Sequence, residues 1–197
     1  MAHDGRLDRR LTGLGLAALL LAGCGATPPA SWVVPTAPAQ SHFDSGVLSF
    51  DYPGAWSAAR FDVVSSFSTV IVYLSTSPLA DPCDRTPDSM ACTRLAVSAL
   101  APDGILVAWS RRSWASWAFD ATKGRLLAVA GRRATIEQLD PSQGCAAVGG
   151  TRELAVTIDD PTPDWNWTEA WACLRGPSLD AVQAQVEAML ATVRWNE

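Results

Sequence analysis

The sequence predicts an α+β domain, built on a mostly antiparallel sheet and closed by an amphipathic helix near the C-terminus. Three observations support this prediction. Short stretches rich in β-branched and aromatic residues recur between Gly, Pro and Asp turn residues, as is typical of strands. A stripe of apolar residues at helical spacing follows Pro177. Apolar residues make up 48% of the 197 residues and charged residues 18%, a composition that folds around a core.

The chain begins with the pattern of an export signal. Arg6, Arg9 and Arg10 form a positive start, and residues 11–22 are uncharged. As a helix this stretch would be about 18 Å long, well short of a hydrocarbon core of about 30 Å. We therefore expect residues 1–23 to be a signal peptide that is removed, rather than a membrane span.

The signal ends in Leu21-Ala22-Gly23-Cys24, which resembles the lipobox of bacterial prolipoproteins. In that class of protein the cysteine thiol carries diacylglycerol and becomes the first mature residue. Several acyl chains, at about 0.8 kcal/mol per buried CH₂ group, would anchor the protein stably. An ordinary secretory signal with a chance cysteine is the alternative. We expect lipidation of Cys24 and a location on the extracytoplasmic face of the cell membrane.

Residues 24–42 are expected to be a tether between the lipid and a single globular domain, residues 43–197. Prolines recur in this segment among Ala, Ser and Thr, so it should be semi-extended and reach roughly 50 Å at about 3.1 Å per residue. The signal carries three arginines and two aspartates, so its removal changes the formal net charge from −5 to −6. That charge argues against nucleic acid as a partner.

Four cysteines follow Cys24, and an even number in an exported chain indicates two disulfides. Three pairings are open. Cys83–Cys92 and Cys145–Cys173 are favoured because each pairs the nearest neighbours in sequence. A zinc site is the alternative, but the chain has no C-x-x-C pair and no histidine near these cysteines.

The strands are expected where apolar and β-branched residues cluster between turn residues. Pro102-Asp103-Gly104 is expected to form a hairpin turn between two of them. A helix should run from Pro177-Ser178 to about Trp195 and cover one face of the sheet. The expected strands are 47–52, 68–75, 94–100, 105–109, 125–130, 132–139, 153–158 and 168–174.

Two segments carry a resemblance to a known family. Tyr52-Pro53-Gly54-Ala55-Trp56 resembles the opening Y-P-x-x-W signature of PsbP-like domains, and the closing residues 188–194 are similar to the end of their last helix. The segments around Cys145 and Cys173 are similar to those of uncharacterised lipoproteins from high-GC Gram-positive bacteria. The resemblance spans residues 43–196. It implies an α/β/α sandwich around an antiparallel sheet, in a fold whose members tend to bind other proteins and share no reaction.

No residue pattern points to catalysis, a cofactor or a metal. His42, at the end of the tether, is the one histidine after the signal. A Ser-His-Asp or Cys-His arrangement would therefore have to use it. This histidine is expected to be solvated. Asp159, Asp160 and Asp164 could together hold calcium, but they lack the ligand pattern of an EF-hand and are expected to form a solvated turn.

Tryptophan is the most informative residue type, because all nine tryptophans follow the signal. Trp167 and Trp171 should share one face of a strand. Arg111, Arg112, Trp114 and Trp117 form a candidate binding surface, since arginine and tryptophan are enriched in interaction hot spots. The alternative, that Trp114 and Trp117 are core residues, is left open.

These patterns favour a non-enzymatic envelope lipoprotein that binds another protein or an envelope component. A carrier or sensor of a small apolar ligand is the alternative, and it would need an apolar cavity of about 300 Å³ between sheet and helix. An enzyme is a third reading, which would need polar groups converging in a cleft.

Overall fold

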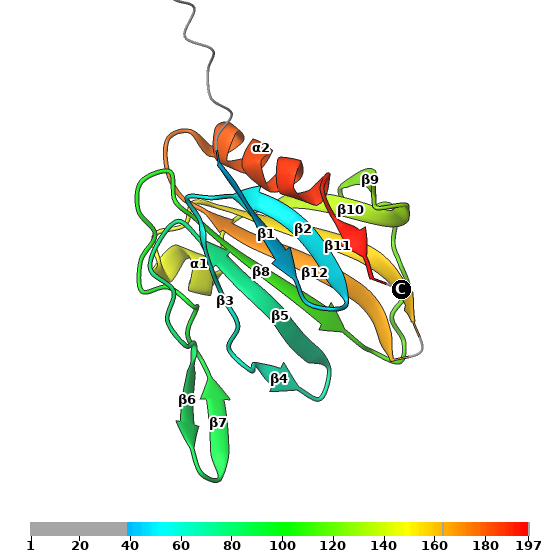
Figure 1. Cartoon of the computed structure of the whole chain (residues 1–197), viewed down its shortest axis with the longest axis horizontal. Coiled ribbons are helices and arrows are strands. Elements are labelled where there is room, and N and C mark those ends of the chain that lie inside the picture. The colour runs from blue at the N-terminus through cyan, green and yellow to red at the C-terminus, as the bar shows by residue number, and fades with distance from the viewer. Residues whose placement is uncertain (1–38, 163, 197) are drawn as a thin grey trace, which may run out of the picture. The chain divides into compact units, whose positions relative to one another are not determined.

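Six of the eight expected strands are part of one large antiparallel sheet in a computed structural model that describes residues 39–162 and 164–196 (Figure 1). The expected strand 47–52 belongs to a smaller sheet. The signal, Cys24 and most of the tether lie outside the described residues. The strands of this sheet lie in the order β3-β5-β8-β12-β11-β10-β9, with β4 also paired to β5. Their bounds are β3 Ser57–Ala59, β4 Val64–Ser65, β5 Ser68–Ser75, β8 Ile105–Arg112, β9 Arg125–Val129, β10 Arg132–Leu139, β11 Arg152–Thr162 and β12 Trp165–Leu174.

The central strand β12 shows how the sheet separates its two faces. Thr168, Ala170 and Ala172 are fully buried on one face. Trp167 and Trp171 alternate with them and lie on the other face, as the strand periodicity predicts. Antiparallel pairing of β12 with both β8 and β11 extends this alternation across the sheet.

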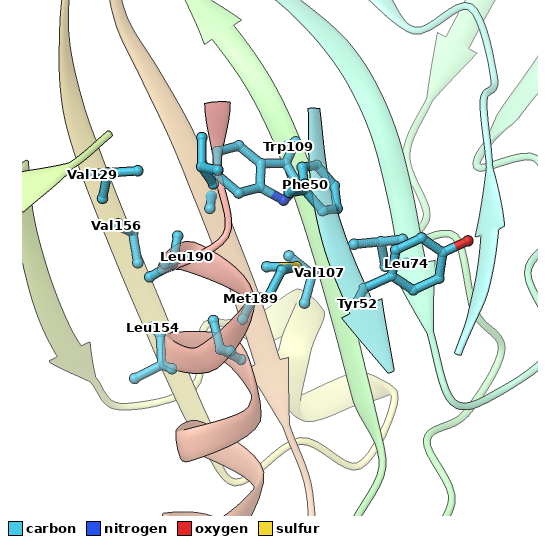
Figure 2. Close-up of a cluster of buried hydrophobic side chains, with 14 of the residues drawn as sticks. Phe50, Tyr52, Leu74, Val107, Trp109, Val129, Leu154, Val156, Met189 and Leu190 are labelled. Carbon is cyan, nitrogen blue, oxygen red and sulfur yellow. The ribbon is translucent and has the colours of Figure 1, made fainter. Parts of the chain in front are cut away.

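The main core lies between the large sheet and a second layer. This layer consists of helix α2, Leu179–Leu190, and a small sheet in the order β1-β2-β13. The strands of the small sheet are β1 Gln40–Asp44, β2 Leu48–Pro53 and β13 Arg194–Trp195. Figure 2 shows Met189 and Leu190 of α2 packed beside Leu154 and Val156 of the sheet. Trp109 stacks on Phe50 with ring centroids 5.2 Å apart.

The opposite face of the large sheet is covered over part of its area. A short helix, α1 Gln143–Ala147, packs there with the buried side chains of Ala96, Val97 and Leu100. The disulfide Cys145–Cys173 joins α1 to β12, and both cysteines are fully buried. A Cβ atom at Gly150 would clash with both sulfurs, so only glycine fits beside this bond.

The second disulfide, Cys83–Cys92, joins the strands of a separate hairpin, β6 Cys83–Thr86 and β7 Ser89–Cys92. This hairpin extends away from the large sheet (Figure 1). Both disulfides are the ones that the cysteine spacing favoured.

Three predictions about local structure are wrong. Residues 94–100 form no strand, because their apolar side chains cover the second face of the sheet instead of joining it. The turn at Pro102–Gly104 is present but joins this irregular segment to β8, so it is not a hairpin turn. The closing helix ends at Leu190 rather than Trp195.

The early end of α2 has an identifiable cause. The Thr192 hydroxyl accepts a hydrogen bond from the Asp51 amide at 2.9 Å and lies 2.7 Å from the Met189 carbonyl oxygen. The next residues then pair with β2, with Arg194 opposite Ser49 and Trp195 opposite Leu48. Pairing with β2 therefore replaces further helical turns. No helix among the described residues is long and apolar enough to cross a bilayer.

Candidate functional site

The four residues of the predicted binding surface do not form one surface. Arg111 and Arg112 are adjacent in β8, so their side chains leave opposite faces of the sheet. Arg111 pairs with Asp160, and Arg112 pairs with Glu169. Trp114 and Trp117 lie in the loop after β8, which forms a turn rather than a helix. They contact different aromatic partners.

Trp114 belongs to an exposed aromatic pair that we call the aromatic tip, formed by Phe67 and Trp114. The Phe67 and Trp114 ring centroids are 4.7 Å apart, and the Ser113 amide donates to the Phe67 carbonyl oxygen at 3.0 Å. Phe67 is 54% exposed and Trp114 is 50% exposed. The core alternative is therefore wrong for Trp114, which lies at the surface.

Trp117 instead closes over the sheet face opposite α2. Its ring stacks on Trp167 with centroids 4.7 Å apart and an interplanar angle of 15°. Phe119 lies edge-on to Trp117 and holds the Arg133 guanidinium 4.9 Å from its ring centroid. A hollow of about 190 Å³ adjoins the stacked pair and is also lined by Lys123. Trp117 is thus half-buried in a surface layer, neither in the main core nor freely exposed.

The same face carries a partly buried ion pair. Glu169 Oε2 lies 2.5 Å from Arg112 Nε, and the Glu169 side chain is 17% exposed. Burial raises the pKa of the Glu169 carboxyl above its ordinary value, and the attraction of Arg112 offsets only part of that rise.

A second polar cluster lies on the α2 side of the sheet, and we call it the paired-arginine site. Asp160 is fully buried. Its carboxylate accepts from Arg111 Nε at 3.0 Å, from Arg132 Nη1 at 2.5 Å and from the Thr168 hydroxyl at 2.9 Å. The neighbouring strands β8, β12, β11 and β10 bring these residues together. This arrangement satisfies the buried carboxylate.

The expectation of a solvated turn at Asp159 and Asp160 is wrong, because β11 continues to Thr162. Asp159 pairs with the exposed Arg133 on the other face. Among the described residues, no group of three His, Cys, Asp or Glu side chains could hold a metal ion.

Sequence reasoning missed Arg132 and Asp160 as partners. Arg132 lies in a strand that was predicted, and Asp160 lies where β11 continues beyond its predicted end. The two residues are 28 positions apart, and no local pattern links them. One feature of the sequence could have indicated this contact. Asp159 and Asp160 follow an apolar strand, and if that strand continues through them, one of the two carboxylates points to the buried face and needs a partner.

His42 lies in β1, so the domain begins before the expected boundary at residue 43. Its Nδ1 is 2.8 Å from the Asp51 carboxylate, and its side chain is 61% exposed. The exposed side chain agrees with the expectation of a solvated residue.

The apolar-ligand alternative required space between sheet and helix. In the described part of the chain that space holds fully buried side chains, including Leu154 and Val156 (Figure 2). Val186 of α2 is also fully buried in this core. The hollows near α2 lie at its N-terminus and along its polar side, where Asp180 lines both. The packing thus gives no support to a carrier of an apolar ligand.

Neither protein-family models nor curated proteins match this chain. Among solved structures, the chain is similar to a crystal structure of a protein from Bacteroides thetaiotaomicron VPI-5482, with a TM-score of 0.37 and 12% identity. The alignment covers 79% of this chain and 48% of that protein, so the chain spans about half of its length.

Proposed function

We propose that this protein is a lipid-anchored lipoprotein on the extracytoplasmic face of the cell membrane, whose domain binds another protein or an envelope component without catalysing a reaction. The aromatic tip carries this proposal. Phe67 and Trp114 come from two separate segments, contact each other in a tilted arrangement and each remain about half exposed. Aromatic anchors of this kind dominate interfaces because they bury much apolar area with few rotatable bonds.

The anchor itself is proposed from the basic start, the short apolar stretch and Leu21-Ala22-Gly23-Cys24. The two disulfides are consistent with an exported protein. We also propose that the domain is a PsbP-like α/β/α sandwich. This is supported by the positions of α2 and α1 on opposite faces of the sheet.

The binding role can be tested by photo-crosslinking in the native envelope. Benzoylphenylalanine is placed at Phe67 or Trp114, and at Leu126 as a control. Leu126 is 58% exposed on β9, at the other edge of the sheet. We expect one protein or glycan adduct, identified by mass spectrometry, that is common to positions 67 and 114 and absent at 126. Adducts that are identical at all three positions, or adducts to lipid alone, would contradict the proposal.

The anchor is tested separately by Cys24→Ser. We expect the variant to leave the detergent phase or to accumulate as uncleaved precursor, while the wild type partitions with detergent. If the variant is processed and partitions like the wild type, Cys24 does not carry the anchor.

A further inference from the structure

We propose that the paired-arginine site binds an oxyanion, a phosphate or carboxylate group, in the hollow beside Arg111 and Arg132. This role is separate from the aromatic tip and does not depend on it. The inference rests on an imbalance of charge, on unused donors and on a hollow next to them.

The charge balance at the site is positive. Two guanidinium groups share the single carboxylate of Asp160. The side chains of Arg111 and Arg132 are only 16% and 21% exposed, so water screens their charge less than at an open surface. The Asp44 carboxylate accepts from the Gly46 amide and from Asn196, whereas the ion pairs of Arg111 and Arg132 are both with Asp160. A bound anion would balance the second guanidinium directly.

Both arginines also have N–H donors that make no hydrogen bond to the described residues. Each guanidinium carries five N–H groups. Hydrogen bonds to the described residues engage two from Arg111, to Asp160 and Thr162, and one from Arg132, to Asp160. Planar forks of this kind match the oxygen spacing of carboxylate and phosphate.

Indole rings hold both guanidiniums in place. The Arg132 guanidinium carbon lies 3.8 Å from the ring centroid of Trp195, and that of Arg111 lies 5.3 Å from the centroid of Trp165. Trp195 is itself fixed through its indole N–H, which donates to the Val129 carbonyl oxygen at 3.4 Å. The donors are thus preorganised, which lowers the entropic cost of binding.

The space beside these donors has a suitable size. A hollow of about 210 Å³ is lined by Arg111, Arg132 and Trp195, together with Gly46 and Val47 of the β1–β2 turn. A second hollow of about 200 Å³ shares Arg111 and Val47 with it and adds a third cation, Arg60. A phosphate or carboxylate group fits the first hollow, and the second extends the cationic lining from Arg111 to Arg60.

The test uses the ¹⁵N-labelled full chain in detergent, in a buffer free of phosphate and sulfate, titrated with inorganic phosphate or with sodium acetate. We expect saturable NMR shifts of the Trp195 indole N–H and the Gly46 and Val47 amides. Saturation with phosphate alone, or with acetate alone, identifies the preferred oxyanion.

Two neighbouring arginines supply matched variants. Arg132→Gln should weaken binding about ten-fold, the value of one charge-assisted hydrogen bond. Arg133→Gln makes the same change of charge on the opposite face, where Arg133 pairs with Asp159, and should leave the dissociation constant within about two-fold. Arg132→Lys keeps the charge but loses the planar fork, and it serves if the Gln variant does not fold.

Three results would overturn the proposal. One is the absence of saturable shifts with either anion. Another is a shift pattern centred away from Trp195. The third is equal weakening by the Arg132 and Arg133 variants, which would reduce the effect to overall charge.

Discussion

Asp159 and Asp160 are neighbours in β11, yet they pair with arginines on opposite faces of the sheet. Asp159 bonds to Arg133, whose side chain is 68% exposed, while Asp160 is fully buried between Arg111 and Arg132. The alternation of strand side chains thus places one carboxylate near solvent and the other inside the domain.

This difference predicts unequal effects of two identical substitutions. Asp160→Asn should lower the free energy of unfolding by about 3 to 5 kcal/mol, because it leaves partly buried arginines without their counter-charge. Asp159→Asn should cost less than about 1 kcal/mol, as for exposed ion pairs. Urea unfolding measures both. Equal losses would show that Asp160 does not hold the arginines.

A second prediction concerns tryptophans of different burial. Trp109→Ala should lower the free energy of unfolding by about 3 to 5 kcal/mol, because the ring is fully buried against Phe50. Trp114→Ala should cost less than about 1 kcal/mol, since half of that side chain is already in water. A strongly destabilised Trp114 variant would place this residue in the core and remove the aromatic tip.

The two disulfides should contribute differently. Chain-entropy arithmetic gives ceilings of about 2.7 kcal/mol for Cys83–Cys92 and 3.6 kcal/mol for Cys145–Cys173, since the second loop is longer. Cys145 and Cys173 are also packed in the second core, whereas Cys92 is exposed. Paired Cys→Ala variants should show a larger fall in melting temperature for Cys145/Cys173. The reverse order would contradict this account.

Glu169 should make stability depend on pH. Its folded pKa is raised above the ordinary value of 4.5 by burial, so between these two pKa values the folded state binds more protons than the unfolded state. Stability from this group therefore falls as pH rises from about 4.5 through the folded pKa. Glu169→Gln removes this slope, so the variant should gain stability relative to the wild type over that window.

The measurement is the free energy of unfolding of the wild type and the variants between about pH 2.5 and 7, a range that covers both sides of 4.5. Glu187 provides an internal contrast, because its hydrogen bonds with Gln183 and Arg125 lower its pKa. Glu187→Gln should therefore lose stability relative to the wild type as pH rises toward 4.5. A wild-type advantage over Glu169→Gln that grows with pH would be the wrong sign.

Local sequence patterns were enough to predict several elements. The bounds of β5 and β10 were predicted to the residue, because in each a run containing β-branched and apolar residues is set off from its flanking segments. The disulfide pairs also followed from sequence spacing. In each case the information lies within a short stretch of chain.

Long-range pairing decided the rest. The helical pattern extends to Trp195, but hydrogen bonding to β2, more than 140 residues earlier in the chain, makes Arg194–Trp195 a strand. Likewise, Asp160 meets Arg132 only because β11 lies beside β10 in the sheet. The sequence by itself determined which segments prefer strand or helix and which face of each is apolar. Only the tertiary structure determined which charged side chains meet, because a buried charge is stabilised by whichever partner the strand order brings within hydrogen-bond distance.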